Sequence, residues 1–251
     1  LTMSFDAGAY DDKLTEIFNK YKIKGTFHLN LSSESFKNSD ITPDMLHERY
    51  KGHEISCHGC LHKTLTYLPV QQLYSEIFEN RRVLEEFAGY PVIGHSYANG
   101  KYSDEVISAL KSMGIVYSRT TKNTGDFALP NDFMKWHPTC HYKQCMEYGR
   151  KLLDSMHGYF GYPKLLYVWG HGHELEHNSH WGMMDEFCSM MSENESIWYA
   201  TNIEIYNYIT AQRRLVISAD ESMVFNPSSM EIWFAKDDNI YSAAPGQMLN
   251  L

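Results

Sequence analysis

Two histidines spaced four residues apart are the first sign of chemistry in this sequence. His58 and His62 follow residues 54–57, a stretch predicted to be a short strand. On a helical turn this spacing places both imidazoles on one side, about 6 Å apart, which is close enough to share one metal ion. The carboxyl end of a strand is also where α/β folds place their sites. For such a pair taken alone, two unrelated surface histidines are the alternative.

An acid and a third histidine stand at the ends of two other predicted strands. Asp6 follows residues 1–5 and precedes Ala7-Gly8, where a carboxylate can act as a base or a metal ligand. Its alternative role is to cap the following helix. His171 follows the apolar run of residues 165–169. Because the carboxyl ends of parallel strands share one edge of a sheet, we expect Asp6, His171 and the histidine pair to meet there.

The cysteines offer a competing interpretation. Cys57-His58-Gly59-Cys60 has the Cys-x-x-Cys spacing of a redox pair or of half a zinc site. No second such motif follows, since Cys140 and Cys145 are too widely spaced and Cys188 is isolated. The five cysteines are therefore predicted to be small core residues, and their odd number argues against a disulfide framework.

Composition excludes several classes of protein. The 251 residues carry 22 Lys and Arg against 31 Asp and Glu, a net charge of −9, which disfavours nucleic acid and anionic lipid as partners. A hydrophobic fraction of 43% excludes a disordered chain. No apolar run approaches the ~18 residues that would span a bilayer. Histidine is abundant, with 13 residues.

Localisation and oligomeric state stay open at this point. The sequence begins directly on an apolar stretch, without a basic segment, an apolar segment and a cleavage site, so no signal peptide is expected in it. Unpaired cysteines favour a reducing compartment such as the cytoplasm.

Strand and helix patterns alternate along most of the chain, which predicts βα units and a mostly parallel sheet, open or closed into a barrel. Strands are predicted at residues 1–5, 26–31, 54–57, 92–97, 115–119, 165–169 and 197–201. Helices are predicted at residues 14–21, 70–87, 104–113, 142–156, 181–191 and 203–212. Short strand candidates at 215–218, 223–225 and 231–235 then predict a small antiparallel appendage. We therefore expect a catalytic domain at 1–212 and a β appendage at 213–251.

In their order along the chain, these motifs resemble those of the NodB-homology polysaccharide deacetylases, the family 4 carbohydrate esterases. The family motif Thr/Ser-Phe-Asp-Asp-Gly is matched by Ser4-Phe5-Asp6-Ala7-Gly8 except at one position, and His-Ser/Thr-x-x-His is matched in spacing by His58 and His62. Arg-x-Pro-Tyr/Phe-Gly corresponds loosely to Ser96-Tyr97-Ala98-Asn99-Gly100. The resemblance covers residues 1–210. It is closest to a bacterial subgroup with Trp-His-Pro-Thr-Cys-His, here 136–141, and Tyr-Val-Trp-Gly-His, here 167–171.

The resemblance implies a distorted (β/α)7-type, TIM-like barrel and a metal-dependent hydrolase that removes an N-acetyl group from a carbohydrate and releases acetate. Asp6 would be the general base, and His171 the general acid with His173 as its rival. His58 and His62 would hold a divalent metal, Zn²⁺ with Co²⁺ or Ni²⁺ as alternatives. Chitin oligomers, peptidoglycan, xylan and small amides all suit the family as substrates. The expected substrate-contacting residues are Tyr97, Asn99, Trp136, His137 and Trp169, with His141 also lining the pocket.

Two positions depart from the family pattern. Ala7 stands where the family has a metal-ligating Asp, and Ser96 where it has Arg. Asp6, Asp11, Asp12 or a water molecule would then complete the metal site, and the sequence leaves open whether the alanine is natural or introduced. The loss of an anionic ligand favours, as the alternative function, a non-catalytic carbohydrate-binding protein on the same scaffold.

Overall fold

The computed structural model describes residues 1–34, 42–156, 163–237 and 239–251. Within these ranges the chain divides into two compact units, one formed by residues up to 202 and one by residues from 203 onward. The predicted domain boundary at residue 212 stays a prediction. No described helix combines the length and the apolar character needed to cross a membrane.

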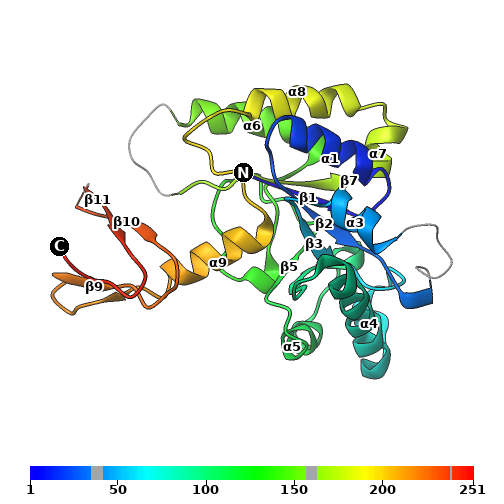
Figure 1. Ribbon diagram of the computed structural model, residues 1–251, viewed down its shortest axis with the longest axis horizontal. Helices are drawn as coiled ribbons and strands as arrows, with labels where there is room; N and C mark the ends of the chain where they lie inside the picture. The colour runs from blue at the N-terminus through cyan, green and yellow to red at the C-terminus, as the bar shows by residue number, and fades with distance from the viewer. Residues whose placement is uncertain (35–41, 157–162, 238) are drawn as a thin grey trace. The chain divides into compact units, whose positions relative to one another are not determined.

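Seven parallel strands form the sheet of the first unit, in the order β5-β4-β3-β2-β1-β7-β6 (Figure 1). They are short and largely buried on both faces, as parallel strands covered by helices must be. Their bounds are β1 Thr2–Asp6, β2 Gly25–Leu29, β3 Glu54–Cys57, β4 Gly94–Ser96, β5 Tyr117–Arg119, β6 Cys140–His141 and β7 Tyr167–His171. This strand order puts β1 at the centre of the carboxyl edge, between β2 and β7.

Residues 136–141 connect the two edge strands of this sheet, because they begin beside β5 and end in β6. Trp136 forms a parallel bridge with Arg119 of β5, and three residues later the Thr139 amide donates to the Tyr167 carbonyl of β7 at 2.9 Å. The sheet therefore curls toward closure instead of lying open. The predicted distorted barrel of βα units is confirmed.

Helices cover the outside of the curled sheet, with α6 and α8 along one side of it and α4 and α5 along another (Figure 1). Each presents an apolar stripe inward; in α4, for example, Leu73, Ile77 and Leu84 are buried at helical spacing. Left-handed Gly89 then ends that helix. The bounds are α1 Asp11–Lys20, α3 Pro43–Arg49, α4 Val70–Ala88, α5 Asp104–Ser112, α6 Cys145–Asp154, α7 Gly172–His177 and α8 Trp181–Met191.

The predicted strand at residues 197–201 is wrong. These residues form no strand: the Leu1 ammonium donates to the Trp198 carbonyl at 2.9 Å, and the Ala200 amide donates to the Leu1 carbonyl at 3.1 Å. Helix α9, Asn202–Gln212, begins directly afterwards, so no ladder develops. Its apolar side chains made this segment look like a strand because Ile197 and Ala200 pack into the core.

The second unit contains two small antiparallel sheets, as predicted for the C-terminal appendage. One has the order β12-β9-β8 and the other pairs β10 with β11. The sequence prediction missed β11 and β12. The bounds are β8 Val216–Ile217, β9 Met223–Phe225, β10 Ile232–Lys236, β11 Asn239–Ala243 and β12 Met248–Asn250.

Candidate active site

Asp6 is the buried centre of the candidate site. It ends β1 with only 2% of its surface exposed, and the parallel register sets it beside His28 of β2 and His171 of β7. Its Oδ2 forms an ion pair and hydrogen bond with the Arg119 guanidinium of β5, and its Oδ1 accepts from the Ser96 hydroxyl at 3.1 Å. Four strands thus converge on one carboxylate.

The charges around Asp6 fix its protonation state. Burial alone would raise the pKa of this carboxyl, but the charge and hydrogen bond of Arg119, helped by His58 and His28, hold the pKa well below its usual range. Asp6 is therefore ionised at neutral pH.

His58 is buried beside this carboxylate. Its Nδ1 lies 2.9 Å from the Ser96 carbonyl, so the tautomer that carries a proton on Nδ1 donates there. Its Nε2 has no hydrogen-bond partner and lies 3.8 Å from Asp6 Oδ2. Burial lowers the pKa of His58 to about 4, so the ring is neutral at pH 7 and Nε2 keeps a lone pair available to a ligand.

The segment from His58 to His62 is a loop, so the predicted helical turn is wrong. Gly59 has a φ of +81° and His62 a φ of +55°, values outside a right-handed helix. Glu76 of α4 holds the loop instead, accepting the Leu61 amide on its Oε1 at 2.7 Å. The two imidazoles still lie next to each other, with ring centroids 4.8 Å apart.

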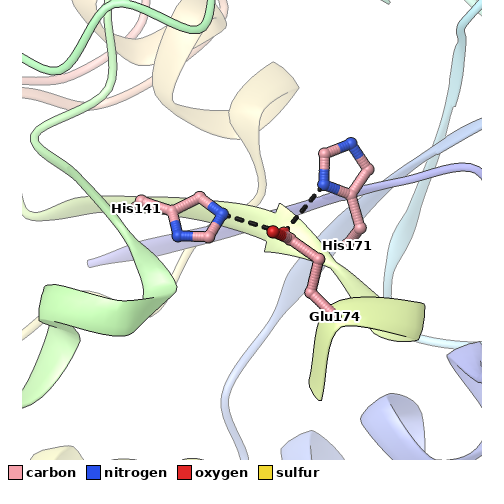
Figure 2. A group of neighbouring side chains, drawn as sticks. All are labelled: His141, His171 and Glu174. Atoms are coloured by element: carbon pink, nitrogen blue, oxygen red, sulfur yellow. Dashed lines mark hydrogen bonds and ion pairs between the residues drawn. The ribbon is translucent and has the colours of Figure 1, made fainter. Parts of the chain in front are cut away.

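His171 faces Asp6 from the other side. Its Nε2 lies 3.8 Å from Asp6 Oδ2, while its Nδ1 lies 3.0 Å from Glu174 Oε2 in α7. The same Glu174 oxygen lies 2.9 Å from His141 Nε2, so one carboxylate holds two imidazoles (Figure 2). Burial raises the pKa of Glu174, but the hydrogen bond from His171 and the charges of both histidines outweigh it and keep the pKa below its usual value. Burial lowers the pKa of His141.

Two of the predicted substrate-contacting residues lie in the core. Tyr97 and Trp136 are each 1% exposed. The Tyr97 hydroxyl donates to the Met134 carbonyl at 2.9 Å, and Trp136 packs edge-on against Tyr167. Their predicted contact with a substrate stays a prediction.

Of the other three predicted contact residues, Asn99 and His137 lie nearer the surface, whereas Trp169 is buried. Asn99 is exposed and its amide donates to Thr64 Oγ1 at 2.8 Å, while half-buried His137 lies 2.6 Å from Thr120 Oγ1. Trp169 is 8% exposed and lies under the Arg119 guanidinium, 4.7 Å from its carbon to the ring centroid. The rival acid His173 packs against His171 at 5.0 Å between ring centroids.

Neither Asp11 nor Asp12 stands where the family has its metal-ligating aspartate, a position occupied here by Ala7. Ala7 is exposed in a left-handed conformation at φ +76°. Asp11 is buried in the first turn of α1, where its Oδ2 accepts from the Tyr50 hydroxyl at 2.8 Å, and burial raises its pKa to about 8. Asp12 is exposed on the same turn.

A divalent metal at the histidine pair fits one observation directly. His58 Nε2 is a buried nitrogen without a hydrogen-bond partner, next to the imidazole of His62. The remaining candidate ligand, Asp6, is already engaged by Arg119 and Ser96. Over the described residues, the three side chains whose ligand atoms all lie within 4.8 Å of one another are instead His141, His171 and Glu174.

All five cysteines are free thiols. Four of them are buried, in agreement with the predicted core role, and Cys60 is half-buried. Burial raises the pKa of Cys57 above its usual value, which disfavours the reactive thiolate.

Sequence reasoning missed Arg119 and assigned no role to Glu174. Arg119 ends the predicted strand 115–119, so the rule that led to Asp6 and His171, a polar residue at a strand's carboxyl end, would also have found it. Glu174 follows His171 by three residues, the spacing at which side chains meet on a first helical turn.

Comparisons with known proteins found one family model and several solved structures of similar fold. A family model described as polysaccharide deacetylase matches residues 1–118. No curated protein matches the chain. Among solved structures, a Mycobacterium smegmatis protein described as a polysaccharide deacetylase is similar at 16% identity and a TM-score of 0.60, over 84% of this chain and 91% of that one.

Two further structures share the fold. Peptidoglycan deacetylase PdaC from Bacillus subtilis is 18% identical with a TM-score of 0.53, over 84% of this chain and 91% of its own. A mutant of BA3943, a CE4 family pseudoenzyme with restored enzymatic activity, is 14% identical with a TM-score of 0.56, over 82% of this chain and 67% of its own. At these identities the likeness shows a common fold.

Proposed function

Because residues 1–118 match the polysaccharide deacetylase family model, we propose that the chain is a metal-dependent hydrolase that removes the N-acetyl group of a carbohydrate and releases acetate. The family resemblance inferred from the motifs is confirmed, and with it the class of hydrolase. The observation that carries the proposed reaction is the position of Asp6. Its ionised Oδ2 lies 3.8 Å from Nε2 of both His58 and His171, as a base between a metal ligand and an acid requires.

His58 and His62 would hold the metal ion, with Asp6 or a water molecule as the third ligand. Two imidazoles with an oxygen ligand suit Zn²⁺, with Co²⁺ and Ni²⁺ as alternatives. When bound, such an ion acidifies a water molecule and polarises the acetamide carbonyl.

The chain's own residues move the protons. Asp6 takes a proton as the water oxygen attacks the carbonyl carbon, and a backbone N–H near Asn99 stabilises the oxyanion. His171 gives a proton from Nε2 to the amine nitrogen as the C–N bond breaks, which leaves acetate and a free amino sugar. Glu174 accepts from His171 Nδ1 and thereby orients the ring toward Asp6.

We expect substrate contacts at Asn99, His137 and Trp169. Asn99 and His137 offer polar groups at or near the surface, and the Trp169 ring contacts the Arg119 guanidinium and the His171 imidazole. The printed name of PdaC specifies peptidoglycan as the substrate of that protein. N-acetylated glycans of the peptidoglycan and chitin type are therefore the first substrates to assay.

A non-catalytic carbohydrate-binding function is the second candidate, because one observation favours it. The position of the family's ligating aspartate is Ala7, and the neighbouring Asp6 carboxylate is committed to Arg119 and Ser96. BA3943 is itself a pseudoenzyme of this fold whose mutant has restored activity.

Acetate release from N-acetylated oligosaccharides, assayed with Zn²⁺, Co²⁺, Ni²⁺ or a chelator, tests the proposal. We expect metal-dependent release by the unaltered chain and faster release by Ala7→Asp, which adds an anionic ligand in a left-handed position that Asp tolerates. His171→Ala should lower the rate about 10²-fold or more, since a general acid is worth that much. His177→Ala, which changes an exposed histidine at the end of the following helix α7, is the matched control.

The outcomes separate the two candidates. If only Ala7→Asp releases acetate, the non-catalytic binding function is favoured, because the missing metal ligand then explains why the unaltered chain is inactive. If neither the unaltered chain nor Ala7→Asp binds metal or releases acetate, the enzyme hypothesis is refuted. An unchanged rate in His171→Ala would refute the assignment of the acid.

A further inference from the structure

A second set of metal-ligating side chains lies on the opposite side of Asp6 from the histidine pair. His141 ends β6, His171 ends β7, and Glu174 stands in the first turn of α7 (Figure 2). We propose that these three residues form a second divalent-metal site, of the Zn²⁺ class, which shares no ligand with His58 and His62.

The distances already suit one shared ion. Glu174 Oε2 lies 2.9 Å from His141 Nε2 and 3.0 Å from His171 Nδ1, and all three ligand atoms lie within 4.8 Å of one another. Zinc ligands at ~2.0–2.2 Å from a tetrahedral ion lie roughly 3.4 Å from each other. An ion can therefore enter by displacing the two shared protons, with small side-chain movements.

The donor set is that of zinc sites that keep an open position. Two imidazole nitrogens and one carboxylate leave a fourth place for water or a ligand. The His141, His171 and Glu174 side chains are 17%, 25% and 24% exposed, so an ion held by them reaches solvent. Trp169 packs edge-on against both imidazoles, at 4.9 Å from His141 and 5.8 Å from His171 between ring centroids, and limits their rotation.

The carboxylate distinguishes this set from the first one. Around His58 and His62 the nearby carboxylate, Asp6, is bound by Arg119. Around His141 and His171, by contrast, the carboxylate oxygen is shared only between the two imidazoles that would bind the ion. An anionic ligand strengthens divalent binding, so we expect the second site to hold an ion even if the first is weakened by Ala7.

One neighbouring charge opposes the ion and provides a diagnostic. Lys143 Nζ lies 3.6 Å from Glu174 Oε1, the carboxylate oxygen that faces away from the two imidazoles. Removing this ammonium leaves all three ligands in place and lowers the repulsion of a divalent ion. Lys143→Met should therefore bind Zn²⁺ more tightly, by about threefold or more, whereas a set of hydrogen bonds that binds no metal would show no such gain.

Calorimetric Zn²⁺ titration and Co²⁺ absorption spectra of the full chain test the proposal. We expect Glu174→Gln and His141→Asn each to lose one bound ion or to weaken it at least tenfold, with His177→Asn unchanged as the control. A His58→Asn, His62→Asn double variant should keep the ion that depends on Glu174. Anomalous scattering at the zinc edge should show an ion among His141, His171 and Glu174.

Unchanged stoichiometry and affinity in Glu174→Gln, or no gain in Lys143→Met, would overturn the site. Because Lys143→Met leaves the ligands intact, it decides the question even if a ligand variant fails to fold. This metal-binding test is independent of the proposed reaction. A chain that releases no acetate can still lose one bound ion in Glu174→Gln, and an active deacetylase can have no ion at the second site.

Discussion

At the scale of single residues, the site depends on one buried ion pair. The fully buried Arg119 guanidinium contacts Asp6 from β5, while Ser96, at the loosely matched family position for Arg, contributes only a hydroxyl at 3.1 Å. A buried carboxylate needs a matching charge, because desolvation would otherwise protonate it. Arg119 therefore keeps Asp6 ionised and fixes its direction toward the two imidazoles.

Arg119→Met should destabilise the protein and abolish activity. Breaking a buried pair from one side leaves an uncompensated charge, at a cost of about 3–5 kcal/mol. Urea unfolding at pH 7 measures the loss. The double variant with Asp6→Asn should recover part of it, since neither charge then remains. The control is Lys151→Met, which removes an exposed pair with Glu147 and should change little. If Arg119→Met and Lys151→Met lowered the unfolding free energy equally, the role of Arg119 would be contradicted.

At the scale of elements, the carboxyl ends of strands were predictable and the groups that hold them were not. Asp6 and His171 end buried apolar runs, so periodicity and strand order alone bring them to one edge. The support for the His58 loop comes from α4, about twenty residues later in the chain, and no local pattern links a helix interior to a loop. The helical turn predicted for that loop failed for the same reason, because Glu76 and a left-handed Gly59 determine its path.

Asn80 is the clearest of these supports. Its Oδ1 accepts the amides of His58 and Gly59, each at 3.2 Å, and its Nδ2 donates to the carbonyls of Leu29 and Leu31 at 3.1 and 2.8 Å. The side chain is fully buried in α4. One amide thus joins the ends of β2 and β3 to the helix that covers them.

Asn80→Ala should loosen the metal-binding loop and the fold together. It leaves buried backbone groups without partners, each worth about 1–3 kcal/mol, so we expect a loss of at least ~2 kcal/mol in unfolding free energy. Zn²⁺ affinity at His58 and His62 should fall, while Glu86→Ala, an exposed change on the same helix, should alter neither. Unchanged affinity and stability in Asn80→Ala would show that the loop holds its own shape.

At the scale of the whole molecule, the first unit buries several acidic side chains, and its stability should therefore depend on pH. Glu54 accepts from Thr26 and Tyr117 at 2.9 and 2.6 Å inside the sheet. Asp11 lies at the start of α1, where only one of its oxygens has a hydrogen-bond partner. The pKa of Asp6 is lowered because the Arg119 guanidinium beside it outweighs the effect of burial, whereas burial raises the pKa of Asp11, whose hydrogen bond from the neutral Tyr50 hydroxyl is too weak to offset it.

Asp11 should make the folded state lose stability as the pH rises. Its pKa is about 8 in the folded protein and ~3.9 in an unfolded chain. Below about pH 4 both states hold the proton. Between pH 4 and 8 only the unfolded chain releases it, so rising pH favours unfolding. At ~1.4 kcal/mol per unit of pKa difference, the loss is on the order of a few kcal/mol.

Asp11→Asn keeps an acceptor for the Tyr50 hydroxyl and removes the titration. The variant should equal the unaltered protein in unfolding free energy near pH 4 and exceed it at pH 8, measured by urea denaturation across that range. Asp12→Asn, an exposed change in the same turn, should leave the slope against pH as it was. If Asp11→Asn and the unaltered protein ran parallel from pH 4 to 8, Asp11 would be ionised in the folded state and its burial would be balanced by a charge elsewhere.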